Sequence, residues 1–580
     1  MKRPWRRCLS CVLALCVLLP PAALTASAAS AEPLVVNVIT DVHFRPLWAV
    51  PDVGAIVNMP GSELYAHAAY NAQLYPESEA VLAEFFKGAA ASASSAVLVA
   101  GDMVDGANRA YHSAFAQRLA AFENSTGKRV FVINGNNDIS PGSPGCASPE
   151  DFAAIYADFG FNEALSRDPS SLSYSVDLDG GYRLLAIDSC KYGESSGVLT
   201  PAVLQWIRGQ AQDAGRDGKH LVAMMHHALL RHYGGFGDLV LDRALDDDRI
   251  DNADAVWEEL ADLGIQIIFT GHMHANSITK DTSAKGNELY DIETNALTTY
   301  PCSWRTVTFG QEGVGVTTRT VGSVDPANLP AGYNAAQLAL LEGGFPRYAY
   351  GYIAASAQYM LKVNLLYPQN ALNRFGIDAQ SDLGKLLLAV LPDAYGCFCM
   401  PLYATPQTQG ASIEEIAALG GYTLPASGYA SFFEVLNVII GQYTCGDADM
   451  PGDAPEVRLL LDCIKAVMVY ALGRNADKIT PESLKEFSAL TGIRFTEAET
   501  RAGLASLLFR RNLVNRTVRS LALPFLEGVT KDAFAPADVN VGLPPYGEIQ
   551  NRFGFFDRLL ETLRAYFDKL MKMFSFFIDY

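Results

Sequence analysis

The sequence predicts an α/β domain whose sheets are covered by helices, followed by a mostly α-helical region. Continuous apolar, β-branched runs recur along the first half of the 580-residue chain, and helix-like segments separate several of them. After about residue 335 the apolar spacing becomes helical. Hydrophobic residues make up 49% of the chain and charged residues 18%, which is typical of a globular protein.

The first 31 residues are predicted to be a Sec-type signal peptide, which lies outside the fold. A basic start precedes an apolar run that prolines interrupt, and small residues suited to cleavage follow it. The apolar run is too short to span a membrane. We therefore expect the protein to be secreted or held in the cell envelope.

Six buried strands are expected in the first domain, because each run is apolar and rich in β-branched residues. They span residues 33–40, 95–101, 128–135, 183–189, 220–227 and 265–272. Amphipathic segments predict helices at 77–90, 109–124, 201–215 and 253–263. Further strands are expected within 288–301 and at 313–321.

The chain after these strands changes in character. Residues 32–322 are predicted to form the α/β domain, residues 323–334 a linker, and residues 335–580 a helical domain of unknown role. Two helix starts are expected there, at Thr480 followed by proline and at Thr496 with Glu499 three positions on.

The last segment, residues 555–577, carries apolar residues along one face of an expected helix. The favoured interpretation is a terminal helix docked on the core. Association with a membrane surface, or with a second copy of the chain, is the alternative.

Charge and cysteine content exclude some classes of protein. The net charge of −19 weighs against nucleic-acid binding, because an acidic surface repels phosphate backbones. Seven cysteines follow the leader, too few and of the wrong parity for a disulfide scaffold, and their pairing cannot be read from the sequence.

Polar side chains gather where the predicted strands end. Sites in open α/β sheets form beyond the carboxyl ends of the strands, so these residues are expected to meet. Nine histidines in 580 residues would give roughly 0.14 His-x-His pairs by chance, and one pair stands after a strand and a glycine. The candidate metal ligands are Asp41, His43, Asp102, Asn136, His226, His272 and His274.

The ordered series DVH, GDMVD, GNND, HH and GHMH resembles the calcineurin-like metallophosphoesterases, over residues 33 to about 320. Two further stretches, SLSYSVD and GVLTPAVLQWI, resemble secreted bacterial members of uncharacterised role. The resemblance implies a sandwich of two mixed β-sheets flanked by helices. It also implies hydrolysis of phosphate mono- or diesters by a hydroxide that bridges two metal ions.

The resemblance also distributes the ligands between the two metals. One metal would be held by Asp41, His43, Asp102 and His274, and the other by Asp102, Asn136, His226 and His272. A shared carboxylate is physically required because two close cations repel, and Asp102 is that group. His226 is preferred to His227, since the family uses the first histidine of its pair. Mixed nitrogen and oxygen ligands favour Mn, Fe or Zn.

Asn137 stands where the family usually has a histidine that protonates the leaving group. An amide can donate a hydrogen bond but cannot give up a proton to an alkoxide. Three explanations remain open: an acidic leaving group, another proton donor such as His232, or a slow enzyme. Asp105 is expected to orient the turn by accepting hydrogen bonds from the backbone or from Asn137.

The leading hypothesis is a secreted dinuclear phosphoesterase acting on a small-molecule phosphoester. The alternative is a non-catalytic envelope or surface protein that keeps a metal-loaded fold and binds through its helical domain. The long aromatic insert at 44–76 follows a ligand loop and is a candidate wall of the substrate pocket.

Overall fold

The computed structural model describes the chain from residue 33 to residue 547. Within that range it leaves out residues 52, 54–71, 233–248, 407–411, 447–449, 451, 497–502, 504–505 and 531–537. The predicted signal peptide, the terminal helix at 555–577, most of the insert and Glu499 lie outside the described residues. No helix in the described part of the chain is both long and apolar enough to cross a membrane.

The first sheet has six strands in the order β13-β12-β11-β1-β2-β3. The three strands β1, β2 and β3 run parallel, and β11 to β13 add antiparallel neighbours on the other side of β1. The strands are β1 (Leu34–Ile39), β2 (Ala96–Ala100), β3 (Arg129–Ile133), β11 (Ser303–Gly310), β12 (Gly313–Thr320) and β13 (Asn540–Leu543).

The second sheet has seven strands in the order β4-β5-β6-β7-β8-β10-β9. Its centre, β6 to β7 to β8 to β10, is parallel, and its edges are antiparallel. The strands are β4 (Ser166–Arg167), β5 (Tyr174–Asp177), β6 (Tyr182–Ala186), β7 (His220–Met224), β8 (Ile265–Thr270), β9 (Ser277–Thr282) and β10 (Glu288–Glu293).

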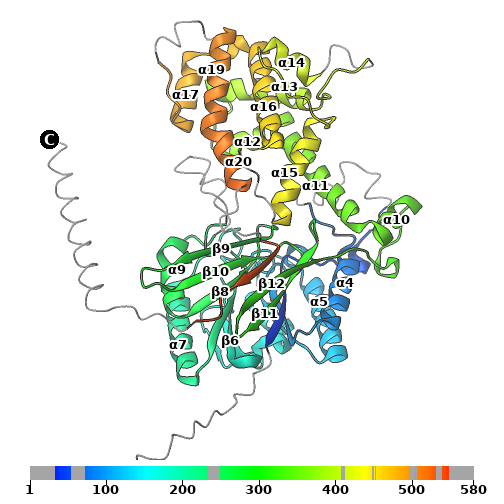
Figure 1. The fold of residues 1–580 in the computed structure, drawn as a ribbon, viewed down its shortest axis with the longest axis vertical. Coiled ribbons are helices and arrows are strands. Elements are labelled where there is room, and N and C mark those ends of the chain that lie inside the picture. Colours follow the sequence, from blue (N-terminus) through cyan, green and yellow to red (C-terminus); the bar gives the residue numbers. More distant parts are fainter. Residues whose placement is uncertain are drawn as a thin grey trace, which may run out of the picture. The chain divides into compact units, whose positions relative to one another are not determined.

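Helices cover the outer faces of the two sheets, with α4 and α5 on one side and α7 and α9 on the other (Figure 1). Their termini follow local rules: Thr200 caps α7 by accepting from the Val203 N–H, and Gly218 ends it in the left-handed region. The helices are α4 (Ser78–Ala91), α5 (Arg109–Thr126), α6 (Pro149–Ile155), α7 (Pro201–Asp217) and α9 (Ala253–Asp262).

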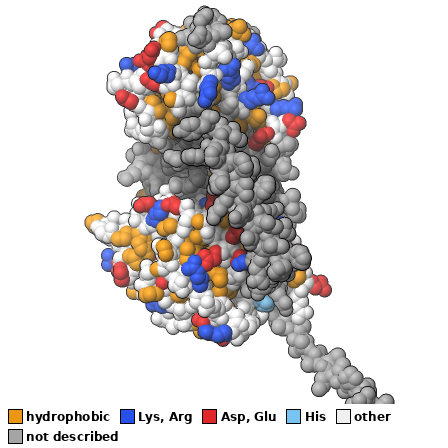
Figure 2. Space-filling model, turned by 90° about the vertical axis from the view of Figure 1, so that its left-hand side faces the viewer, with side chains coloured by type: hydrophobic (Ala, Val, Ile, Leu, Met, Phe, Trp, Pro, Cys, Tyr) orange, Lys and Arg blue, Asp and Glu red, His pale blue; other side chains and the backbone are white. Residues whose placement is uncertain are grey.

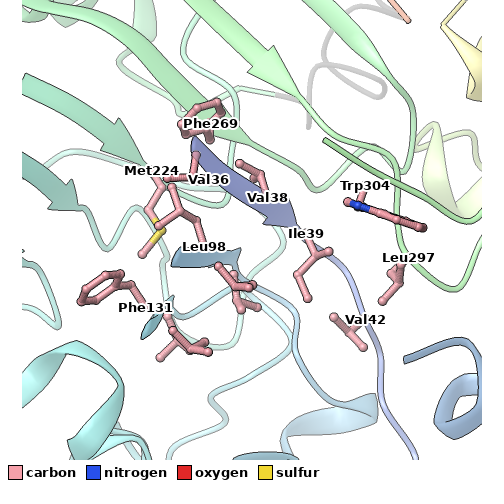
Figure 3. Close-up of a cluster of buried hydrophobic side chains, with 14 of the residues drawn as sticks. Val36, Val38, Ile39, Val42, Leu98, Phe131, Met224, Phe269, Leu297 and Trp304 are labelled. Carbon is pink, nitrogen blue, oxygen red and sulfur yellow. The ribbon is translucent and has the colours of Figure 1, made fainter. Parts of the chain in front are cut away.

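The main core lies between the two sheets. Figure 3 shows Val36 and Leu98 of the first sheet together with Met224 and Phe269 of the second, and all four are buried. Continuous apolar strands are expected when both faces of a parallel sheet are covered, as here. This packing holds the carboxyl ends of the parallel strands at one edge, where the candidate ligands lie.

The helical region forms a second core around α16 (Pro455–Arg474). As predicted, Thr480 caps the helix that begins at Pro481. The remaining helices are α10 (Ala335–Gly343), α11 (Phe345–Leu361), α12 (Gln369–Arg374), α13 (Asp382–Phe398), α14 (Ile413–Leu419), α15 (Phe432–Cys445), α17 (Pro481–Thr491), α19 (Leu507–Thr517) and α20 (Leu523–Thr530).

These observations confirm the predicted fold class: two mixed sheets flanked by helices, then a mostly helical region. The domain boundaries stay a prediction, and two features cross them. Leu341 and Phe345, after the expected linker, belong to the same buried cluster as the sheets and their covering helices. The chain also returns near its end to add β13 to the first sheet. All seven cysteines after the leader are free thiols.

Candidate metal centre

The candidate ligands lie at one edge of the sandwich, just beyond the ends of β1, β2, β3, β7 and β8. Backbone hydrogen bonds tie the ligand loops together, from Asp41 N to Gly101 O and from His43 N to Asp102 O, each 3.0 Å long. A third bond joins Gly271 N to His226 O at 2.9 Å. Within each sheet, the neighbouring ligand loops are thus fixed against one another.

Five of the seven candidate ligands have a left-handed backbone. Their φ angles are 49° at Asp41, 42° at His43, 50° at Asp102, 77° at His272 and 54° at His274. Non-glycine residues rarely adopt this region, and such strain persists where the surrounding structure enforces it, often at functional sites. The concentration of strain at one edge therefore marks the edge as functional.

Glycines beside the ligands allow the loops to approach closely. A Cβ atom on Gly135 would lie 2.2 Å from Asp102 Oδ1, and one on Gly271 would lie 2.1 Å from Thr40 Oγ1. Neither position has room for a side chain. The glycines of the GNND and GHMH motifs are therefore needed for packing around the ligands.

The first cluster joins Asp41, His43 and His274. Asp41 Oδ1 is buried and has no hydrogen-bond partner among the described residues. It lies 3.3 Å from His274 Nε2 and 3.8 Å from His43 Nε2, and the two Nε2 atoms are 3.2 Å apart. A buried carboxylate oxygen without a partner, facing imidazole nitrogens, fits a divalent cation.

The second cluster joins Asp41, Asp102 and His226. His226 Nδ1 lies 3.0 Å from the carbonyl oxygen of Ala100, which favours the tautomer that leaves Nε2 free to bind a metal. Nε2 lies 3.0 Å from Asn136 Oδ1 and 3.4 Å from Asp102 Oδ2. Asp102 Oδ2 is also 3.8 Å from His43 Nε2, so this carboxylate approaches the first cluster, while Asp41 belongs to both clusters.

His272 lies beside His226, and neither of the two clusters includes its ring. Its N–H donates to Asp41 Oδ2 at 2.9 Å, and its ring centroid lies 5.2 Å from that of His226. His227 points elsewhere: its ring nitrogens lie 2.9 Å from Ser189 Oγ and 2.8 Å from Ser195 O. The first histidine of the pair is therefore the one that faces the cluster.

The carboxylates of the two clusters favour positive charge between them. Burial opposes the charged form of His226, but Asp102 and Asp41 outweigh it and raise the pKa of His226 to about 10. Burial likewise opposes the ionisation of Asp41, but His226 and His274 lower its pKa below the usual range. The site is thus built to stabilise a cation.

Asn137 contacts the carboxylate of Asp102. Its side-chain amide donates to Asp102 Oδ2 at 2.6 Å, and its backbone N–H donates to Oδ1 of the same residue at 2.8 Å. The side chain is otherwise exposed, at the rim of the site. It is placed to hold Asp102 in position and, lacking an ionisable proton, offers none to a leaving group.

The other two predicted catalytic residues have different surroundings. Asp105 accepts from Arg45, whose Nε lies 2.9 Å from Asp105 Oδ2, while the amide of Asn137 donates to Asp102 instead. His232 is buried, with Nδ1 2.9 Å from Ser277 Oγ and Nε2 3.4 Å from Asp291 Oδ1. These contacts fit orienting and structural roles better than proton donation.

Several supporting residues were not predicted. Thr40 Oγ1 donates to Asp41 Oδ2 at 2.7 Å, and Asn295 Nδ2 donates to His274 O at 2.5 Å. Asp138 accepts from the N–H groups of Gly135 and Met103, at 2.8 and 2.9 Å, and so joins two ligand loops. Asp138 is the last residue of the GNND motif, and its adjacency to Asn136 was the available signal.

Comparison with known proteins agrees with this geometry. Residues 34–276 match the family model of the calcineurin-like phosphoesterases. No curated protein matches the chain.

Several solved structures resemble about half of the chain. A dimetal phosphatase from Danio rerio has 12% identity and a TM-score of 0.36 over 50% of this chain and 97% of its own. A purple acid phosphatase from yellow lupin has 12% identity and a TM-score of 0.32 over 51% of this chain and 53% of its own. A predicted phosphoesterase from Streptococcus pneumoniae has 11% identity and a TM-score of 0.20 over 50% and 90%.

The motif series, the two-sheet fold and the family match agree with one another. Residues 34–276 therefore match the calcineurin-like phosphoesterase family, and this match favours a metal-dependent phosphoester hydrolase.

Proposed function

We propose that this protein is an exported phosphoesterase that uses two divalent transition-metal ions to hydrolyse small phosphate mono- or diesters. The observation that carries the proposal is the buried, unpartnered Asp41 Oδ1, which faces imidazole nitrogens on both sides. Export rests on the basic and apolar leader in residues 1–31.

The donor set supports two cation positions. Asp41, His43 and His274 would hold one ion, and Asn136, His226 and His272 would hold the other, with Asp102 between them. Mn, Fe or Zn suits these nitrogen and oxygen ligands. When bound, such a pair of ions generates a nucleophile from water at neutral pH and neutralises charge on the phosphoryl oxygens.

The residues of the chain supply orientation. Asn137 and the backbone hold Asp102, Thr40 holds Asp41, and Asn295 holds the loop that carries His274. Because Asn137 cannot protonate an alkoxide, the proposed substrate has a leaving group acidic enough to depart unaided, or the turnover of poorer esters is slow.

The surface charge supports a small substrate rather than a nucleic acid. The chain carries 63 acidic and 44 basic residues. On the face shown in Figure 2, acidic and basic side chains are interspersed over the described part and form no continuous basic stripe. A nucleic acid would need such a stripe to neutralise its phosphates.

An activity and metal screen of the purified protein tests the proposal. We expect about two Mn, Fe or Zn ions per chain after dialysis, measured by elemental mass spectrometry, and turnover of 4-nitrophenyl phosphate or bis(4-nitrophenyl) phosphate. Two tightly bound ions without turnover of any mono- or diester would instead support the non-catalytic binding protein.

The variant Asn137→His tests whether the amide at this position limits protonation of the leaving group. It should raise turnover of alkyl esters at least about tenfold more than turnover of 4-nitrophenyl esters, because only poor leaving groups need a proton donor. Rates are measured on matched alkyl and aryl phosphates, with Asn162→His, on an exposed loop, as the control. An equal change on both ester types would show that leaving-group protonation is not the limitation.

A further inference from the structure

A groove of about 420 Å³ opens beside the candidate metal centre. One end is formed by Met273 and His274 of the ligand loop, together with Ala72 and Thr299. The other lining residues come from the helical region, from α11 with the turn that follows it and from α15. The volume is in the range of small-molecule sites.

The walls of the groove are mostly apolar. The wall residues are Ile353, Ser356, Ala357, Met360, Leu361 and Asn364 from α11 and the turn that follows it, and Leu436, Ile440 and Thr444 from α15. Asn364 already donates to Met360 O at 2.8 Å, and Thr444 donates to Gly441 O at 3.1 Å. Among the described lining residues, none carries a carboxylate, ammonium or guanidinium group. An occupant of these walls is therefore uncharged and apolar.

His274 connects the groove to the metal cluster. Its side chain is 22% exposed, whereas the side chains of Asp41 and His226 are fully buried. Its Nε2 faces Asp41 Oδ1 at 3.3 Å, and the same residue lines the groove. A molecule with its phosphoryl group at the cluster can therefore extend into the groove.

Hydrogen bonds hold the walls in place against the ligand loop. Asn276, two positions after His274, donates from its backbone N–H to Thr444 O at 3.2 Å and from its side chain to Cys445 O at 3.4 Å. On α11, Tyr348 donates to the buried carboxylate of Glu77 at 2.6 Å. The groove is thus a built feature of the fold.

We propose that this groove binds an alkyl chain of the substrate, so that the enzyme acts on phosphate esters that carry an aliphatic chain. The proposal rests on the proposed phosphoesterase function. The ligand loop receives the phosphoryl group, and the α11 and α15 walls receive the chain. Each added methylene that is buried should strengthen binding about threefold, until the groove is full.

The test uses alkyl 4-nitrophenyl phosphates from methyl to octyl, whose aryl leaving group is constant. In the metal-loaded full-length protein, kcat/KM should rise about threefold per methylene and then level off. Binding of the matching alkyl phosphonates, measured by calorimetry, should tighten with the same dependence. The binding arm reports on the groove without requiring turnover.

Variants locate the effect in the groove. Leu436→Gln and Met360→Gln should each lower kcat/KM for the octyl ester at least about threefold, while leaving kcat/KM for the methyl ester unchanged. Leu419→Gln, at a leucine that is 69% exposed, is the matched control. Thermal melting verifies that each variant is folded, and the two groove variants lie on different helices.

The outcomes separate the two proposals. Turnover that does not depend on chain length, with equally flat phosphonate binding, overturns the groove and keeps the phosphoesterase. Binding that tightens with chain length, without turnover of these diesters or of 4-nitrophenyl phosphate, keeps the groove and overturns the phosphoesterase. Retained chain-length dependence in folded Leu436→Gln and Met360→Gln also overturns the groove.

Discussion

Replacing Asp102 by alanine is expected to abolish hydrolysis of 4-nitrophenyl phosphate esters, with a loss of at least about 10³-fold. Asp102 Oδ2 lies 3.4 Å from His226 Nε2 in the second cluster and 3.8 Å from His43 Nε2 in the first, so we propose that it is the carboxylate that bridges the two cations. Without a carboxylate between them, two cations held close together would repel. The several kcal/mol that they would contribute to catalysis would then be lost.

The measurement combines rate and metal content. Elemental mass spectrometry after dialysis should find fewer than two ions in Asp102→Ala, and the rate should not be restored by added Mn, Fe or Zn. Asp281→Ala, at an exposed residue of β9, is the matched control and should keep the wild-type rate. Full activity of Asp102→Ala would contradict the assignment of the metal centre.

The strands, and the polar residues that gather beyond their ends, were predictable for one physical reason. A parallel strand that is covered on both faces is continuously apolar, so its end is visible where polar residues begin. The predicted strand at 95–101 and the observed strand β2 (Ala96–Ala100) agree on this basis, and Asp102 follows at once. The ordered motifs indicate the family from the sequence alone.

Elements whose pairing depends on distant parts of the chain were not predictable. Strand β11 was missed because the buried Arg305 interrupts its apolar pattern. Strand β13 has only four residues and pairs with β12 across more than 200 positions of sequence. The groove needs α11, α15 and the His274 loop together, and no single segment signals it.

The contacts of Asn137 and Asp105 could not be predicted from the sequence either. Both residues lie in the predicted turn region, but their partners depend on side-chain directions that spacing does not specify. Asn137 donates to Asp102, and Asp105 instead accepts from Arg45. A motif thus predicts which residues gather, while the hydrogen bonds among them require the structure.

Arg305→Met should lower the melting temperature by roughly 5–10 °C, because it removes a buried cation worth about 3–5 kcal/mol. Arg305 on β11 is fully buried and donates to Glu293 O on β10 at 3.0 Å. It also donates to Thr318 Oγ1 and to Asp538 O. One guanidinium therefore joins the two sheets and the segment that leads into β13.

The charges around Arg305 explain why methionine cannot replace it. Burial lowers the pKa of Arg305 to about 10, and the carboxylates of Asp538 and Glu293 act in the opposite direction. Methionine fills a similar volume but leaves the carbonyl oxygens of Glu293 and Asp538 without this donor, and the two carboxylates without the positive charge of the guanidinium.

Arg319→Met separates this effect from a general loss of charge. Arg319 is an exposed residue of β12 in the same sheet, and its replacement should change stability by less than about 0.5 kcal/mol. Limited proteolysis gives a second measurement, because loss of the bond to Asp538 should expose the segment before β13 to cleavage below the melting temperature. If Arg305→Met had the same melting temperature as Arg319→Met, the guanidinium would not be what holds β13 to the sandwich. Strand pairing alone would then have to account for the attachment of β13.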